Sequence, residues 1–69
     1  MKSYSIVMYD YEGNCQIEER KIDKSLDPVF IMMDYMMSDK KIAYMILVDL
    51  QTKMSYDVSR GDLEINMTL

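Results

Sequence analysis

The sequence predicts a single α+β domain over residues 1–69, with the element order ββαβββ and one helix packed on one face of a largely antiparallel sheet. Two observations indicate this fold class. Segments in which apolar and polar residues alternate, the pattern of half-buried strands, occur on both sides of a largely apolar run that only Asp34 interrupts. That run, residues 29–37, follows an Asp-Pro pair of the kind that opens helices.

The first predicted strand spans residues 3–10. Its inward face is apolar and consists of Tyr4, Ile6 and Met8. Residues 11–14 then supply a turn, and Gly13 is the natural site for a positive φ because glycine has no Cβ to clash. We therefore expect a β-hairpin at the start of the domain.

The return strand of this hairpin is predicted over residues 15–22. Its isoleucines, Ile17 and Ile22, have opposite parity, so a regular strand cannot direct both side chains toward the core. Either a β-bulge near residues 18–19 or an early end of the strand would reconcile the two positions.

The predicted helix begins at Pro28 and ends near residues 38–39. Asp27 is the expected N-cap because its carboxylate can accept hydrogen bonds from first-turn amides, and Ser25 is the competing cap. Proline suits the first helical position since it has no N–H that would lack a partner. The two lysines at residues 40–41 are expected to lie favourably near the negative end of the helix dipole.

This helix is more apolar than a surface helix, which is the strongest reason to expect a partner. At 100° per residue its apolar side chains cover an arc of roughly 260°, and only Asp34 and Ser38 fall in the gap. We expect the middle of the arc to face the chain's own sheet, namely Val29, Met32, Met33 and Met36. The flanks are then free for a second copy or another protein: Phe30 and Met37 on one side, Ile31 and Tyr35 on the other.

Residues 42–48 are predicted to form the central strand of the sheet, because both faces of this segment are apolar. One face consists of Ile42, Tyr44, Ile46 and Val48, and the other of Ala43, Met45 and Leu47. A helix of about twelve residues is roughly 18 Å long and covers two or three strands spaced about 4.8 Å apart. One chain therefore leaves one of these two faces uncovered. Either this strand tolerates water on one side or two chains pack together, and we predict a homodimer.

Two more strands are predicted over residues 53–58 and 63–69. The first directs Met54, Tyr56 and Val58 inward and Asp57 outward. The second alternates throughout, with an apolar face of Leu63, Ile65, Met67 and Leu69. The segment between them contains Arg60-Gly61-Asp62, the tripeptide of integrin ligands, which we interpret as part of a turn.

The composition argues against several classes of function. Twelve acidic residues against eight basic ones give a net charge of −4, which disfavours binding to nucleic acid. The chain has no histidine and a single cysteine, so the usual general base and the common zinc ligands are missing. No catalytic or cofactor motif is recognisable in the sequence. We therefore expect a non-enzymatic protein without a cofactor or metal.

The sequence predicts a cytoplasmic protein that does not enter a membrane. Its first residues show no charged leader followed by a long apolar core, which a signal peptide requires. The longest apolar run, residues 42–48, is much shorter than a membrane-spanning helix. A single cysteine is also typical of a reducing compartment.

These observations predict a small acidic protein-binding module that inhibits or modulates a larger protein, a function common among small phage and mobile-element proteins. Its acidic turns are expected to contribute to binding, with Asp57, Asp62 and Glu64 as the main residues. Such acids can imitate the phosphates of nucleic acid in a basic groove. The second hypothesis is an oligomer that sequesters a small anionic ligand, such as a nucleotide, through Lys, Arg and Tyr side chains. A minor nucleic-acid-binding domain ranks third and an enzyme last.

Overall fold

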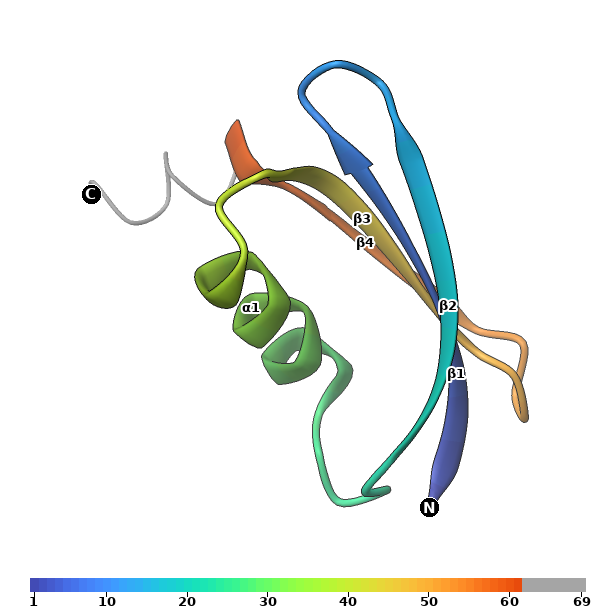
Figure 1. The fold of residues 1–69 in the computed structure, drawn as a ribbon. Coiled ribbons are helices and arrows are strands. Elements are labelled where there is room, and N and C mark those ends of the chain that lie inside the picture. Colours follow the sequence, from blue (N-terminus) through green and yellow to red (C-terminus); the bar gives the residue numbers. More distant parts are fainter. Residues whose placement is uncertain (62–69) are drawn as a thin grey trace.

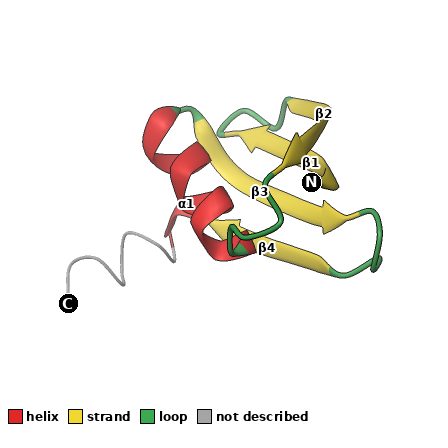
Figure 2. Cartoon of the chain, turned by 90° about the horizontal axis from the view of Figure 1, so that it is seen from below, coloured by secondary structure: helices red, strands yellow, loops and turns green. Residues whose placement is uncertain are grey.

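The computed structural model describes residues 1–61, in which the elements follow the order β-β-α-β-β (Figure 1). The elements are β1 (Lys2–Asp10), β2 (Cys15–Ile22), α1 (Pro28–Ser38), β3 (Ile42–Asp49) and β4 (Ser55–Ser59). The strands form one antiparallel sheet in the order β2-β1-β3-β4, and α1 packs on one face of it (Figure 2). The predicted α+β fold class is confirmed. The predicted strand over residues 63–69 lies outside the described residues.

The hairpin of β1 and β2 is confirmed with its turn. Gly13 has a φ of 89°, as expected for the glycine of this turn. The Asp10 carboxylate holds the turn from inside, because one of its oxygens accepts hydrogen bonds from the backbone N–H groups of Glu12 and Asn14, both at 2.9 Å. The Asn14 side-chain amide donates to the other oxygen at 2.9 Å.

Neither the predicted bulge in β2 nor its early end is present. The pairing of β1 with β2 runs without a register shift from the Lys2–Ile22 pair to the Tyr9–Cys15 pair. Ile22 therefore packs against the core, while the Ile17 side chain is 66% exposed on the opposite face. The prediction was wrong because it assumed that both isoleucines are buried.

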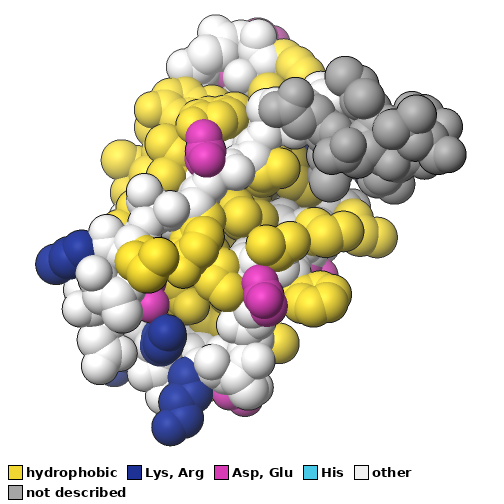
Figure 3. Space-filling model, turned by 180° about the vertical axis from the view of Figure 1, so that it is seen from behind, with side chains coloured by type: hydrophobic (Ala, Val, Ile, Leu, Met, Phe, Trp, Pro, Cys, Tyr) yellow, Lys and Arg dark blue, Asp and Glu magenta, His cyan; other side chains and the backbone are white. Residues whose placement is uncertain are grey.

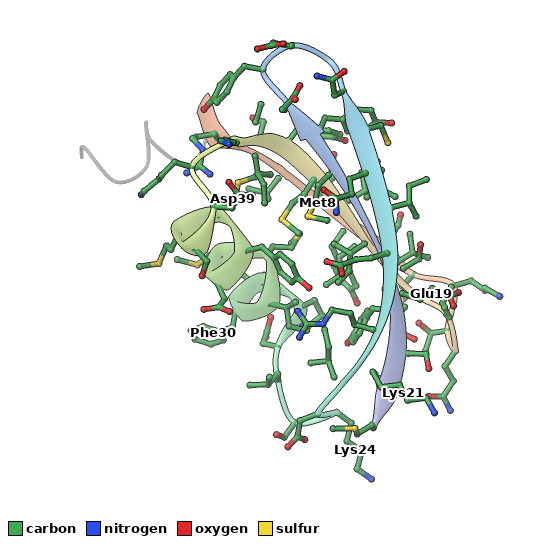
Figure 4. The ribbon with its side chains drawn as sticks, in the orientation of Figure 1. Met8, Glu19, Lys21, Lys24, Phe30 and Asp39 are labelled. Carbon is green, nitrogen blue, oxygen red and sulfur yellow. The ribbon has the colours of Figure 1, made fainter. Side chains whose placement is uncertain are left out.

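The core lies between α1 and the sheet. The side chains that are most deeply buried come from β1, β3 and α1 and are Tyr4, Ile6, Met36, Met45 and Leu47. Figure 4 shows Met8 of β1 directed into the same space between helix and sheet. The helix therefore covers the Met45 and Leu47 face of β3, and the Tyr44, Ile46 and Val48 face lies on the other side of the sheet.

The helix begins as predicted but is rotated about its axis relative to the prediction. The backbone N–H of Val29 donates to Oδ1 of Asp27 at 2.8 Å, which confirms Asp27 as the N-cap. The buried helix residues are Ile31, Met32 and Met36. Val29 was expected to face the sheet but is 54% exposed, so the buried face is turned by roughly 80° at 100° per residue. An arc with so few polar positions does not define which part of it is buried.

The C-terminal end of α1 is closed by Arg60, and the last helical turn contains no basic residue. Arg60 is buried, and its guanidinium donates to the carbonyl oxygens of Met36 at 2.8 Å, Asp39 at 2.9 Å and Ile42 at 2.9 Å. Ser59 ends β4, so Arg60 leaves the sheet and reaches the helix at once. Arg60, the first residue of the Arg-Gly-Asp tripeptide, therefore stabilises the fold through these hydrogen bonds.

Strand β4 pairs with β3 at the sheet edge, and Tyr56 and Val58 pack against the core as predicted. Met54 was also expected to point inward, but it precedes β4 and is 57% exposed. Within residues 1–61, no helix has both the length and the apolar character needed to cross a membrane.

Candidate protein-binding surfaces

Two apolar surfaces lie on opposite sides of this two-layer fold. The open sheet face is the face of the sheet that α1 does not cover, and its central apolar residues are Val7, Tyr9, Ile17, Tyr44 and Ile46. The outer helix face is the side of α1 directed away from the sheet, together with Leu26, which lies two residues before the helix. It consists of Leu26, Val29, Phe30 and Met37. Seen from behind, hydrophobic side chains cover much of the molecular surface (Figure 3).

The open sheet face is built from two rows of side chains that cross the strands. Val7 pairs with Ile17 of β2 on one side and with Ile46 of β3 on the other, which gives an aliphatic row. Tyr9 pairs in the same way with Cys15 and Tyr44, which gives a second row beside the first. Side chains on neighbouring strands contact each other at such pairs.

The tyrosine row also engages an acidic residue. The rings of Tyr9 and Tyr44 are 5.9 Å apart between centroids and are tilted by 39°. The Tyr44 hydroxyl donates to Oδ2 of Asp57 at 2.8 Å, and this hydrogen bond raises the pKa of Tyr44 above its ordinary value. Asp57 was predicted as an outward partner-binding residue, and it lies here at the margin of the open sheet face.

The outer helix face presents an aromatic and a thioether side chain on one stripe, two helical turns apart. Phe30 is 69% exposed and Met37 is 65% exposed, and at 100° per residue they lie within roughly 20° of each other around the helix. Figure 4 shows Phe30 on the side of α1 away from the sheet. Asp34, which is also exposed, is the acidic residue on this part of the helix.

A groove of about 430 Å³ lies between β2 and α1 and joins the outer helix face. It is lined by Arg20, Ile22, Leu26, Phe30, Ile31, Asp34 and Tyr35. The Arg20 guanidinium donates to the Tyr35 hydroxyl at 2.7 Å and lies 5.8 Å from the centre of its ring. The Tyr35 hydroxyl in turn donates to Glu18 at 3.2 Å. Burial is the main cause of the raised pKa of Tyr35.

Two acidic residues at the turns, Asp10 and Asp49, are engaged within the fold. Asp49 is buried, binds Nζ of Lys2 at 3.1 Å and accepts hydrogen bonds from the backbone N–H groups of Gln51 and Thr52. Asp10 holds the β1–β2 turn, and hydrogen bonds from Asn14 lower the pKa of its carboxyl group. These carboxylates stabilise turns, so their charges are partly compensated by the chain itself.

The structure places the predicted partner-binding residues in different environments. Phe30 and Met37 are exposed on the same stripe of α1, as expected for a binding surface. Ile31 was expected on an exposed flank but is buried in the core, and Tyr35 is half-buried in the β2–α1 groove. Asp57 lies on the opposite side of the molecule from the helix. Asp62 and Glu64 lie outside the described residues, so the three predicted acids cannot be placed relative to one another.

Sequence reasoning did not select Ile17 or Arg60. Ile17 was assumed to be buried, although its opposite parity to Ile22 was the available signal that one of the two isoleucines points outward. Arg60 was assigned to a turn by its neighbours, and no local pattern shows that it reaches helix carbonyls about twenty residues earlier in the chain.

The chemistry available at these surfaces is contact and hydrogen bonding. Among residues 1–61, no group of three acidic or cysteine side chains is arranged to hold a metal ion. Neither a protein family, nor a curated protein, nor a solved structure matches this chain. The exposed apolar surfaces are the features of the described residues that most need a functional explanation, because monomeric proteins rarely expose large apolar patches.

Proposed function

We propose that the chain is a small, non-enzymatic protein-binding module that inhibits or modulates a larger protein and contacts it through the outer helix face. The observation that carries this proposal is the exposure of Phe30 and Met37 on one stripe of a helix whose opposite side is already buried in the core, two turns apart as the anchors of a groove-binding helix are. An amphipathic helix that lays such a face into an apolar groove is a common mode of protein recognition.

The chemistry of this face suits a partner protein. Methionine is flexible and polarizable, so it adapts to the shape of an apolar groove, and an aromatic side chain is a frequent anchor of binding free energy. Val29 and Leu26 extend the surface beyond the anchor pair. The exposed carboxylate of Asp34 lies beside them and favours a partner groove with a basic rim.

Imitation of nucleic acid by the acidic turns has less support. Asp10 and Asp49 hold turns, and Asp57 accepts a hydrogen bond from Tyr44, so these three carboxylates already have partners in the chain. The charge of Asp62 and Glu64 remains available to this hypothesis. Reversal of Asp57, Asp62 and Glu64 to Lys tests it, because mimicry requires that binding to a basic partner weaken strongly and become less sensitive to salt.

The β2–α1 groove supports a second candidate function, the binding of a small anionic ligand with an apolar body. Its volume of about 430 Å³ is in the range of small-molecule sites, and Arg20 is the cation on its wall. Glu18 and Asp34 lie near this guanidinium and oppose the approach of an anion. Thermal stabilisation by a nucleotide that disappears in Arg20→Ala would favour this candidate over protein binding.

The proposed function is tested with two matched sets of substitutions. Phe30→Ser with Met37→Ser removes the anchor pair, and Met54→Ser removes a methionine of similar exposure that lies on neither surface. Proteins retained by the wild-type chain from an extract of its native source are identified, purified and titrated against each variant by calorimetry. We expect the double variant to bind at least about tenfold more weakly, while Met54→Ser binds like the wild type.

Equal binding by the double variant and the wild type would exclude the outer helix face as the contact surface. Catalytic turnover by the wild-type chain would contradict the proposal that its function is binding. Far-UV circular dichroism and a thermal melt of each variant show that the fold is retained, which is expected because exposed positions tolerate substitution.

A further inference from the structure

We infer that the open sheet face is a self-association surface, on which a second copy of this chain packs sheet against sheet. The resulting dimer has four layers in the order α/β/β/α, and both outer helix faces stay exposed. This inference is independent of the proposed function, because the two surfaces lie on opposite sides of the sheet. It places the homodimer contact on residues of the sheet and not on the flanks of the helix.

The first argument is the apolar character of the face across three of its four strands. The row formed by Ile17, Val7 and Ile46 spans three adjacent strands, and the row formed by Cys15, Tyr9 and Tyr44 lies next to it. Val48 of β3 extends this area along the strand. Water on such a face is unfavourable, and a second sheet that packs about 10 Å away removes it.

The second argument concerns charge. The two apolar rows contain no charged side chain except Asp57 at the β4 end, and this carboxylate accepts a hydrogen bond from Tyr44. The other charges on this face are Glu19 and Lys21, which have opposite signs and lie on the edge strand β2. Figure 4 shows both side chains on the side of the sheet away from α1.

This charge distribution favours a second copy over a basic or acidic partner. The centre of the face has almost no net charge, so it offers little complementarity to a strongly charged surface. A copy of the same face brings an equally neutral centre, with opposite charges available at its margin. Interfaces of homodimers are also more apolar than those of transient complexes.

The third argument is the area of the face. A sheet of four strands that are about 4.8 Å apart and about 20 Å long offers roughly 400 Å² of planar area. Two such faces give roughly 800 Å², and the accessible area is larger because side chains stand out from the plane; a specific interface needs about 1,000 Å². The face therefore has about the size that a specific dimer interface needs.

The native cysteine makes the inference testable without a substitution. Cys15 is free, is exposed in the single chain and lies on the open sheet face beside Tyr9. Its rate of alkylation by N-ethylmaleimide is measured at total protein concentrations from about 1 to 500 µM, a range that spans weak to moderately tight dimers. We expect the rate to fall several-fold as the dimer forms, in step with sedimentation equilibrium.

Three variants locate the interface. Ile17→Lys places a charge in the aliphatic row, and Phe30→Lys makes the same kind of change at a position of similar exposure on the outer helix face. Ile46→Thr keeps a β-branched side chain in β3, so the strand should be retained. This variant distinguishes two kinds of dimer, one in which the open sheet faces pack together and one in which the exposed edges of β2 pair, because only the first covers Ile46. We expect Ile17→Lys and Ile46→Thr to raise the dimer dissociation constant, the former at least about tenfold, while Phe30→Lys leaves it unchanged.

Three results would overturn this inference. They are a wild-type chain that stays monomeric over the whole concentration range, a dimer in which Cys15 reacts as fast as in the monomer, and a dimer weakened by Phe30→Lys but not by Ile46→Thr. The first two results leave open the binding of a different protein to the outer helix face, which is tested by the Phe30 and Met37 substitutions. The third result would place the self-association contact on the outer helix face itself.

Discussion

Arg60 is the residue that joins the end of α1 to the sheet. Its guanidinium donates to three carbonyl oxygens that belong to the helix end and to the start of β3. The last carbonyl groups of a helix have no partner within the helix, and a cation near them also interacts favourably with the helix dipole. One side chain therefore closes the helix and fixes its position over β3.

Replacement of Arg60 by Ala is expected to destabilise the fold by about 2–4 kcal/mol, because it leaves buried carbonyl oxygens without a donor. Arg60→Lys should be intermediate, since one ammonium group cannot reproduce the geometry of the planar guanidinium. The measurement is urea unfolding followed by circular dichroism. Arg20→Ala is the control, because Arg20 is exposed and its loss should change the free energy of unfolding little. Equal effects of Arg60→Ala and Arg20→Ala would contradict this role.

Asp49 makes stability depend on pH. Burial acts to raise the pKa of this carboxyl, but hydrogen bonds from the Gln51 and Thr52 amides and from Lys2 outweigh it, so the pKa lies below its ordinary value. The unfolded chain then binds more protons than the folded chain at acidic pH. The stabilisation by Asp49 is therefore present above the unfolded pKa of about 3.9 and is lost as pH falls through the folded value.

We expect Asp49→Asn to lower the melting temperature at about pH 7 and to flatten the acid side of the stability profile. The difference from the wild type should shrink steadily below about pH 4. Thermal melts in a series of buffers give both profiles. Lys2→Met is the matched variant, since it removes the ion pair but keeps the turn, and its effect should be smaller. A pH-independent difference between Asp49→Asn and the wild type would contradict this account.

At the scale of the element, α1 shows that the local sequence encodes where a helix begins but not how the helix is rotated about its axis. Asp27 and Pro28 define its start through local chemistry, a side-chain acceptor followed by a residue without an N–H. The orientation about the axis is set by contacts with β3 and β4 and by Arg60 at the far end. The same apolar arc is compatible with several orientations, so the pattern alone placed Val29 inside and Ile31 outside.

Asp27→Ala is expected to destabilise the protein by about 0.5–2 kcal/mol, because the N–H of Val29 loses its acceptor. Ser25→Ala is the control, because Ser25 precedes the cap by two residues and its backbone N–H bonds to Asp23 independently of its side chain. Chemical denaturation of both variants gives the comparison. A costly Ser25→Ala with a silent Asp27→Ala would mean that the helix begins earlier in solution.

At the scale of the whole molecule, two layers leave two outer surfaces. A chain of 69 residues can bury only about 60% of the surface that its unfolded form exposes, so burial by a further layer is valuable to it. The outer helix face and the open sheet face are both apolar, yet their geometry differs. A ridge of Phe30 and Met37 fits a groove, whereas a flat sheet face fits another sheet.

If the open sheet face joins two copies, the melting temperature must depend on protein concentration, because mass action stabilises the associated folded state. We expect an increase of about 3–6 °C for each tenfold rise in concentration above the dimer dissociation constant. Scanning calorimetry of the wild type and Ile17→Lys over the same concentrations provides the comparison. A constant melting temperature for the wild type, together with dimers in sedimentation at low temperature, would contradict this prediction and would mean that the dimer dissociates before the chain unfolds.

Local patterns in the sequence were sufficient to predict the fold class and the position of each described element. Alternation identified the strands, Gly13 identified the hairpin turn, and Asp27 identified the helix start, because each signal depends on residues that are neighbours in the chain. The doubly apolar segment of residues 42–48 also predicted an uncovered apolar face. It did not determine which of its two faces that is.

Only the tertiary structure decided which apolar side chains are covered. The parity of β3, the outward position of Ile17 and the rotation of α1 follow from the way helix and sheet meet, and no local pattern encodes that contact. Arg60 acts on carbonyl groups that are distant in sequence, so its role also appears only in the folded chain. The sequence by itself determined that surplus apolar surface exists, and the packing of one helix on one side of the sheet determined where it lies.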